Sequence, residues 1–449
     1  MSLFSSNSES DFLPTLVAAR MTGVEKLTVI LDMGRAYVKA GFAGEGVPRT
    51  IFPSPELSQL YQEVSNGNPE YVGVDTSGEI LIRWSTSLGM VLRRIIFESL
   101  LCKPKEVAVV ICEQYTSTTM FRRACANVLL NDMQVQSMCF VNALVASMYT
   151  TGSETGIVID IGSNETRIAP IVDGVAIHSP RFDCPIGANN VLGYLREYFA
   201  GTGAIVLGDH DYEEMLVRCC FVPSFDDSAD RVVRDIPDFL TKSGASVPVS
   251  GSLRSEAVKE IFFSEPADAE GLVGLVLKGI EACPIDARKA VVRNIVLTGG
   301  LASLPGFGHR LVQELQYACE TVESYHPFRA CMSQAHIVDT GIPTITAAWV
   351  GAAIMGSLKA LKMKMIEADT ESQSVVGNRK RMHFDTSQLT RDTVTSACEA
   401  WEERLKGIGK SLEQRTTSPQ QRFHSSIGGS NVSMKTPMAR TYMGLKKSV

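Results

Sequence analysis

The stretch Leu31-Asp32-Met33-Gly34 ends a run of apolar, partly β-branched residues that begins at Leu27. The same arrangement returns as Ile159-Asp160-Ile161-Gly162 and, with threonine in place of the acid, as Leu297-Thr298-Gly299-Gly300. Each apolar run predicts a buried strand, and each glycine predicts a tight turn where the strand ends. Such turns let backbone N–H groups approach an anion, and a carboxylate beside them can hold a cation. We therefore expect two turns to face each other around a cation-bound phosphate tail.

The first two segments also indicate an internal duplication. After the opening strand, apolar runs at 37–42 and 49–52 predict two more strands. The pattern restarts at 156–160, with a second strand at 166–172 and Gly174 at the hairpin. Two such units predict two similar α/β lobes that face a central cleft. Further segments are expected as strands at 107–112 and 295–298, and as helices at 88–101, 118–130, 139–149, 307–318 and 344–361.

Composition limits the classes of function. The chain has 449 residues, of which 45% are hydrophobic, so it can bury a large core in two or three domains. Residues 357–449 hold 16 Lys and Arg against 9 Asp and Glu, a surplus of +7; subtracting this from the net charge of −6 leaves −13 for the first 356 residues. An acidic body argues against nucleic acid as a partner, because broad phosphate recognition needs clustered basic residues.

The cysteines and the apolar segments favour a cytoplasmic protein. The 11 cysteines form no Cys-x-x-Cys pair and lie mostly in apolar segments, where a reduced thiol acts as a small hydrophobic group. The first 20 residues carry Glu9 and Asp11 where a signal peptide needs basic residues. No segment approaches the roughly 20 apolar residues that span a bilayer, so no membrane span is expected.

Several segments resemble the actin family. The resemblance covers about residues 24–360 and is carried by Lys39-Ala40-Gly41-Phe42-Ala43-Gly44 with the following 48–54, by Gly156-Ile157-Val158-Ile159-Asp160, by 296–300 with Leu304-Pro305-Gly306, and by 349–354. Four motifs in a fixed order are specific, although each alone would be weak. The resemblance implies an α/β, actin-like ATPase fold: two RNase H-like lobes around a nucleotide cleft, with a shortened subdomain 2.

The resemblance and the composition together predict the domain boundaries. Lobe I is expected at 24–152 and 342–360, and lobe II at 153–341, after a flexible N-terminal segment at 1–23. Residues 361–449 are expected to be a basic, flexible tail. Within it, apolar residues at steps of three and four predict a helix at 393–413. That helix either packs back on the body or docks a partner.

The resemblance further implies ATP or ADP with Mg²⁺ as a bound, structural cofactor. Asp160 and Asp32 would hold the metal through water, and Lys39 would contact the phosphates. The residues predicted to bind the cofactor are Asp32, Gly34, Lys39, Asp160, Gly162, Ser163, Gly187, Gly299 and Gly300. Each has a simpler alternative, because an acid can cap a strand, a lysine can be solvated and a glycine can serve a tight turn.

Departures from the family pattern argue against hydrolysis. The Asn-Gly-Ser-Gly turn of actin is Met33-Gly34-Arg35-Ala36 here, and Arg35 would either pair with a phosphate oxygen or fill an empty pocket. Ala143 stands where the family has a glutamine that orients the attacking water. Arg167 replaces a histidine linked to that water, and a guanidinium does not accept a proton. We therefore expect no catalytic residues and weak or absent hydrolysis.

Two features indicate a branch of the family. Both resemble actin-related protein 10, also called 11, which is the actin-like subunit at the pointed end of dynactin. One is the segment Cys283-Pro284-Ile285-Asp286-Ala287-Arg288-Lys289, and the other is the short region between Pro53 and Trp84. This implies a cytoplasmic, cytoskeletal subunit that caps a short filament and supports dynein-driven transport along microtubules. The implied partners are the filament-forming actin-related protein of dynactin and the pointed-end subunits p62, p25 and p27.

Two alternatives remain open. An actin-related subunit of a nuclear chromatin-remodelling complex would use the same fold, and the basic tail mildly favours it. The second alternative is an ATP-consuming enzyme of the superfamily, such as a sugar kinase or a chaperone ATPase. It is disfavoured because Ala143 stands in place of the family's glutamine and Ser163 in place of a carboxylate of its second phosphate turn.

Overall fold

The computed structural model of the chain describes residues 27–65, 79–114, 117, 119–178, 180–202, 207–225, 237–264, 271–358 and 366–367. All of them belong to one unit of the chain, Met1–Glu403. The predicted N-terminal segment at 1–23 and the predicted tail helix at 393–413 lie outside the described residues. The predicted lobe boundaries stay a prediction, and we use "first lobe" and "second lobe" below for the two sheets with their helices.

The first lobe is built on a six-stranded sheet with the order β13-β5-β4-β1-β2-β3. β1 pairs antiparallel with β2 and parallel with β4, and β4 is parallel to β5. The strands are β1 (Leu27–Met33), β2 (Tyr37–Phe42), β3 (Thr50–Pro53), β4 (Val107–Glu113), β5 (Ser137–Asn142) and β13 (Ile366–Glu367). The three opening strands were predicted and are confirmed, whereas β13 adds two residues of the predicted tail to the edge of this sheet.

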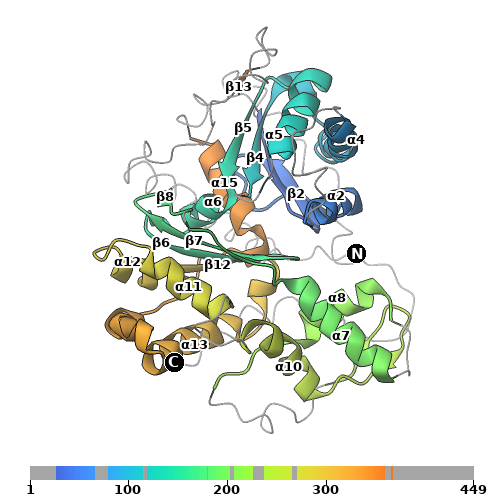
Figure 1. Cartoon of the computed structure of the whole chain (residues 1–449). Coiled ribbons are helices and arrows are strands. Elements are labelled where there is room, and N and C mark those ends of the chain that lie inside the picture. The colour runs from blue at the N-terminus through green and yellow to red at the C-terminus, as the bar shows by residue number, and fades with distance from the viewer. Residues whose placement is uncertain are drawn as a thin grey trace, which may run out of the picture. The chain divides into compact units, whose positions relative to one another are not determined.

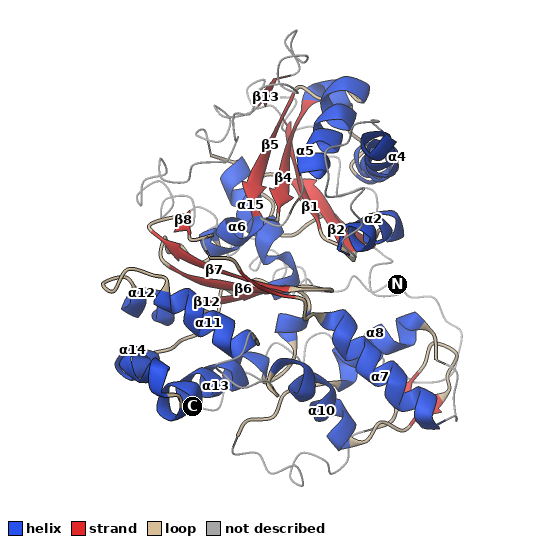
Figure 2. Ribbon diagram, in the orientation of Figure 1, coloured by secondary structure: helices blue, strands red, loops and turns tan. Residues whose placement is uncertain are grey.

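Both faces of this sheet are buried, as expected of its parallel strands. Side chains alternate: Val29 and Leu31 join one apolar cluster with α2, α4 and α5, and Ile30 joins another with α6 and α15. The helices of this lobe are α2 (Pro55–Ser65), α4 (Glu79–Arg93), α5 (Thr119–Ala126), α6 (Ala143–Tyr149) and α15 (Ala347–Gly356). Figure 2 shows α4 and α5 beside the red strands of this sheet.

The second lobe repeats the pairing scheme of the first. β6 pairs antiparallel with β7 and parallel with β12, as β1 does with β2 and β4. Its strands are β6 (Gly156–Ile161), β7 (Thr166–Val172), β8 (Val175–Ala176), β9 (Phe182–Cys184) and β12 (Ile295–Thr298). The predicted internal duplication is therefore confirmed at the level of strand pairing.

Helices cover one face of the second sheet and form a core with the apolar side chains of that face. They are α7 (Ala188–Thr202), α8 (Asp209–Cys219), α10 (Gly251–Phe262), α11 (Leu272–Glu281), α12 (Arg288–Arg293), α13 (Phe307–Thr321) and α14 (Arg329–Met332), and a small hairpin of β10 (Phe239–Leu240) and β11 (Ser246–Val247) is added. Among the described helices, none combines the length and the apolar character that crossing a bilayer requires.

Helices α6 and α15 lie between the two sheets (Figure 1). Their shared cluster takes side chains from both sheets, such as Ile30 from β1 and Val158 from β6. The two helices approach closely at Gly351, where a Cβ would lie 1.7 Å from the carbonyl oxygen of Ala146. Trp349 of α15 donates from its indole nitrogen to the carbonyl oxygen of Ile30 at 3.0 Å. This pair of helices therefore joins the two lobes.

Two expectations from the sequence were wrong in detail. Residues 139–149 were predicted as one helix, but they divide at Asn142 into β5 and α6. The Asn142 side chain accepts hydrogen bonds from the backbone N–H groups of Leu144 and Val145 and so caps α6. The polar, turn-rich composition of residues 56–78 predicts little core there, yet α2 buries Leu57 and Leu60. In both segments, tertiary contacts decide the structure.

The contact between α6 and α15 predicts that Gly351→Ala destabilises the protein. The added Cβ clashes with a backbone carbonyl, and forced repacking of a tight core costs about 1–3 kcal/mol or more. Gly193→Ala in α7 is the matched control, because a Cβ there meets no atom within 4 Å. We expect the control to be stabilised by about 0.5–1 kcal/mol. Chemical denaturation of both variants checks this; equal stability of the two would contradict the described contact.

Candidate functional site

Each lobe places an acid opposite a base on its first hairpin. Asp32 at the end of β1 is the cross-strand neighbour of Lys39 on β2, and their charged atoms lie 2.7 Å apart. Asp160 at the end of β6 is the neighbour of Arg167 on β7, at 2.5 Å. All four side chains are nearly buried, and each pair is separated by seven residues. The duplication therefore extends to a buried ion pair in each lobe.

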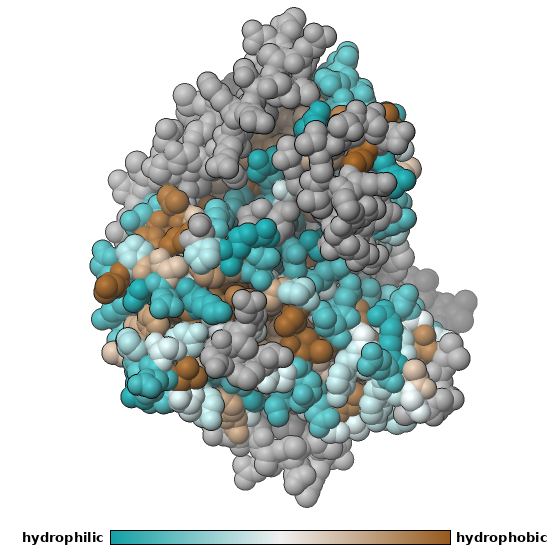
Figure 3. All heavy atoms as spheres, viewed as in Figure 1, coloured by the Kyte–Doolittle hydropathy of each residue, from teal (hydrophilic) through white to brown (hydrophobic). Residues whose placement is uncertain are grey.

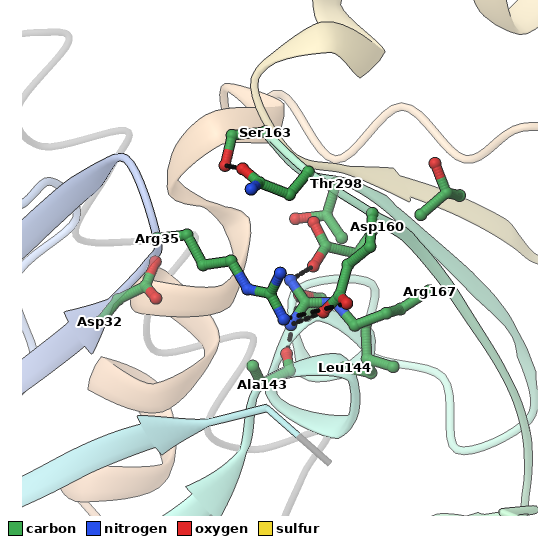
Figure 4. Close-up of polar contacts among 12 residues, drawn as sticks. Asp32, Arg35, Ala143, Leu144, Asp160, Ser163, Arg167 and Thr298 are labelled. Carbon is green, nitrogen blue, oxygen red and sulfur yellow. Dashed lines mark hydrogen bonds and ion pairs between the residues drawn. The ribbon is translucent and has the colours of Figure 1, made fainter. Parts of the chain in front are cut away.

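A third ion pair links the turns of the two hairpins. Arg35, on the turn between β1 and β2, contacts the carboxylate of Glu165, on the turn between β6 and β7, at 3.0 Å. Glu165 also lies 3.5 Å from the guanidinium of Arg167. Figure 4 shows the Arg35 side chain extending toward Arg167 and Asp160. Charges of alternating sign therefore run from Asp160 through Arg167 and Glu165 to Arg35.

A second contact between the lobes starts on the same turn. The hydroxyl of Tyr37 donates to the carboxylate of Glu213 on α8 at 3.0 Å. Burial and the nearby Glu213 carboxylate raise the pKa of Tyr37 to about 12. The phenol therefore keeps its proton, and its role as a hydrogen-bond donor, over the whole physiological pH range.

The second turn is held by the backbone that precedes and begins α7. Gly162 donates to the carbonyl oxygen of Glu165 at 3.0 Å, which closes the turn, and its own carbonyl oxygen accepts from Ala188. Ser163 donates from its hydroxyl to the side chain of Asn164 at 2.8 Å. A Cβ on Gly187 would lie 2.6 Å from the carbonyl oxygen of Ser163. The structure thus brings Gly162, Ser163 and Gly187 together beside Asp160.

The remaining predicted glycines divide into two kinds. Gly299 has φ +95°, and a Cβ there would lie 2.2 Å from the carbonyl oxygen of Ile161, so packing of β12 against β6 requires glycine. A Cβ on Gly34 would lie 2.8 Å from the carbonyl oxygen of Tyr37, as the first turn demands. Gly300 has φ −66° and an ordinary contact of 3.9 Å with Ile345, so neither backbone nor packing requires it.

The start of α6 adds no group that orients water. Ala143 and Leu144 lie beside Arg167 in Figure 4, and Ala143 is buried. The side-chain oxygen of Asn142 is occupied by capping α6, and its nitrogen lies 3.4 Å from His178. The polar neighbour of Ala143 is therefore committed to other contacts.

The family model described as actin matches residues 23–207 and 236–374, which is more than half of the chain. The chain belongs to the actin family. A relative from Dictyostelium discoideum described as actin-related protein 10 is 23% identical over 349 residues. That match covers 65% of this chain and 73% of the relative. The predicted two-lobed, actin-like fold and the recognised resemblance are both confirmed.

Proteins with this fold typically bind a nucleotide with Mg²⁺, but the side chains of this actin-family member do not fit that group as arranged. Asp32 and Asp160, predicted to hold the ion through water, already accept from Lys39 and Arg167. The permanent charges of Arg167 and Arg35 repel a divalent cation. Within the described residues, no three acidic, histidine or cysteine side chains gather to bind a metal directly. Nucleotide contacts at the nine predicted residues stay a prediction, and a metal held at Asp32 and Asp160 would compete with Lys39 and Arg167 for the same carboxylates.

Sequence reasoning missed Glu165, Glu213 and the role of Tyr37. Arg35 was singled out because it is bulky and charged where actin has serine, but its partner is 130 residues away. The available signal was an excess of charge near the two turns, where Arg35 and Arg167 stand in place of a serine and a histidine of the family pattern. Added cations call for an added acid nearby, and Glu165 is the acid in the turn that precedes Arg167.

The buried ion pair Asp32–Lys39 predicts that Lys39→Met strongly lowers the free energy of unfolding. The substitution leaves Asp32 as an unpaired, buried carboxylate, which costs about 3–5 kcal/mol. The double variant Asp32→Asn/Lys39→Met removes both charges, so we expect it to recover most of that loss. Urea denaturation of the three proteins measures this. A single variant as stable as the unchanged protein would show that the pair is not formed.

The raised pKa of Tyr37 predicts that the protein loses stability at alkaline pH. The unfolded chain loses the Tyr37 proton near pH 10, whereas the folded protein keeps it to about pH 12. Tyr37 therefore contributes stability that is fully present below pH 10 and is lost as the pH rises toward 12. We expect the difference in unfolding free energy between the unchanged protein and Tyr37→Phe to shrink between pH 10 and pH 12. A difference that is constant with pH would contradict the contact with Glu213.

Proposed function

We propose that this chain is a non-catalytic structural subunit that caps the pointed end of the actin-like filament of dynactin. In this role it acts in the cytoplasm, at the cytoskeleton, and supports dynein-driven transport along microtubules. The proposal rests on the similarity to actin-related protein 10, on the segment Cys283–Lys289, and above all on how the chain continues after β3. The corresponding subdomain of actin protrudes and receives the next subunit.

The segment after β3 lies against its own lobe here. Leu57 of α2 is fully buried, and the ring of Tyr61 meets Trp84 of α4 edge to face, with centroids 5.7 Å apart. The hydroxyl of Ser58 donates to the backbone carbonyl of Arg35 at 2.5 Å. Burial and hydrogen bonding therefore commit α2 to the first lobe, which supports a subunit with a reduced docking surface for a following protomer.

The interlobe residues support a role without turnover. Phosphoryl transfer to water needs a group that positions the nucleophile, and this chain has Ala143 and a paired Arg167 at the positions that the family uses for it. A nucleotide bound here, whether ATP or ADP with Mg²⁺, would act only as a structural ligand that stabilises the folded state by mass action.

The proposed partners are the filament-forming actin-related protein of dynactin and the pointed-end subunits p62, p25 and p27. On the face shown in Figure 3, apolar residues form small, separated patches among hydrophilic ones. One exposed apolar side chain belongs to the segment that resembles actin-related protein 10: Ile285 is 82% exposed. Arg288 fixes this segment by donating to the carbonyl oxygens of Cys283 and Glu281.

The test is capture of partners with the full chain, followed by a growth assay. Affinity capture with mass spectrometry should recover dynactin subunits, and purified chain should stop growth at the pointed end of filaments of the dynactin actin-related protein. Growth at the opposite end is the internal control, because a cap of one end leaves the other unchanged.

Three results would overturn the proposal. Recovery of remodeller subunits with nuclear enrichment of the tagged protein would favour the chromatin alternative. Phosphate release well above background, abolished in Asp160→Asn, would favour an ATP-consuming enzyme. Unchanged growth at both filament ends would exclude capping even if dynactin subunits were recovered.

A further inference from the structure

The charges at the two hairpin turns balance without any ligand. Three acids, Asp32, Asp160 and Glu165, face three bases: Lys39, Arg35 and Arg167. In the arrangement that the family pattern implies, the acids need a metal cation and the lysine needs a phosphate. In this chain the side chains themselves supply the opposite charge at each position.

We propose that the ion-pair chain Asp160–Arg167–Glu165–Arg35 replaces the metal-bound nucleotide as the link between the two lobes. The Arg167 guanidinium takes the place of the cation at Asp160, at 2.5 Å. The Glu165 carboxylate takes the place of a phosphate group, because it accepts from Arg35 of the first lobe and lies 3.5 Å from Arg167 of the second. The groups that form the link are side chains of the protein itself, so, unlike a bound nucleotide, they cannot diffuse away.

The burial of this chain of charges makes the link effective. The side chains of Arg35 and Glu165 are 21% and 15% exposed, and that of Arg167 is 8% exposed. Ion pairs on an open surface contribute little, because water and salt screen them and the side chains must be ordered. Restricted access to water strengthens the attraction at the same distances.

Neighbouring contacts hold Arg35 in place before it meets Glu165. Its guanidinium lies 5.6 Å from the centroid of the Tyr61 ring of α2, and its backbone carbonyl accepts from Ser58. Tyr37, two residues along the same turn, adds the hydrogen bond to Glu213. The turn between β1 and β2 therefore contacts the second lobe at two points, so less entropy is lost when each contact forms.

This inference goes beyond the proposed function, and its first test uses the unaltered full chain. We expect no nucleotide to copurify, no rise in the midpoint of thermal unfolding on addition of millimolar Mg·ATP or Mg·ADP, and no fall on addition of EDTA. A saturable rise in the midpoint with Mg·ATP or Mg·ADP, or nucleotide released in stoichiometric amount from denatured protein, would overturn the proposal. Tight binding of ATP without Mg²⁺ would overturn it too, because the arginines would then serve a phosphate.

The second test compares two arginines. Arg35→Met breaks the link between the lobes. Arg49→Met is the matched control, because Arg49 contacts Glu45 at 2.6 Å within the first lobe, is similarly buried, and lies 4.5 Å from the centroid of the Phe42 ring. We expect hydrogen exchange at residues 33–37 and 161–167 to become about tenfold faster in Arg35→Met, as loss of a charged hydrogen bond implies. The control should leave the exchange at 161–167 unchanged.

Equal exchange in the two variants would overturn the proposal. If Arg35→Met does not fold, Glu165→Gln keeps the shape of the side chain and removes its charge, and the same acceleration is expected at both turns. Failure of the proposal in either test is distinct from failure of the capping function. Capping is read from filament growth, whereas these tests read ligand binding and exchange within the subunit alone.

Discussion

The contact between α6 and α15 at Gly351 is the constraint on which the rest of the structure depends. Two backbones can approach this closely only where one residue has no side chain, and the gap here admits no Cβ. Because the same two helices bury side chains of both sheets, their spacing fixes the spacing of the lobes. The turns that end β1 and β6 can meet only because this contact sets the distance between them.

Within that frame, duplication has given each lobe the same electrostatic unit, an acid at a strand end paired with a base on the next strand. The pairs Asp32–Lys39 and Asp160–Arg167 are self-sufficient, since each neutralises its own buried charge. What differs between the halves is the turn. The first turn carries Arg35 and Tyr37, which reach out of their lobe, whereas the second carries Glu165, which receives one of them. The two lobes thus share the same strand pairing, but they are joined by turns that carry different side chains.

The sequence predicts the fold well because its signals are local. β-branched runs, glycine turns and ordered motifs indicate the strands, the duplication and the family without any knowledge of distant contacts. The errors arise where distant contacts decide: Asn142 divides a predicted helix because β4 pairs with the preceding residues, and Leu57 is buried because α4 lies beside it. At the site, pattern singles out Asp32, Lys39 and Asp160 as candidates, although their ion pairs with cross-strand neighbours were not predicted. The Arg35–Glu165 contact could not be predicted from local pattern, because it joins residues from different lobes.

The hydrogen bond from Ser58 to the backbone of Arg35 connects two regions that differ in role. Burial of Leu57 and this hydrogen bond hold helix α2 to the first lobe, and the same residue, Arg35, carries the guanidinium that pairs with Glu165 of the second lobe. A rotation of that one peptide unit would displace both contacts together. The position of α2 and the pairing of the two lobes are therefore coupled through a single residue.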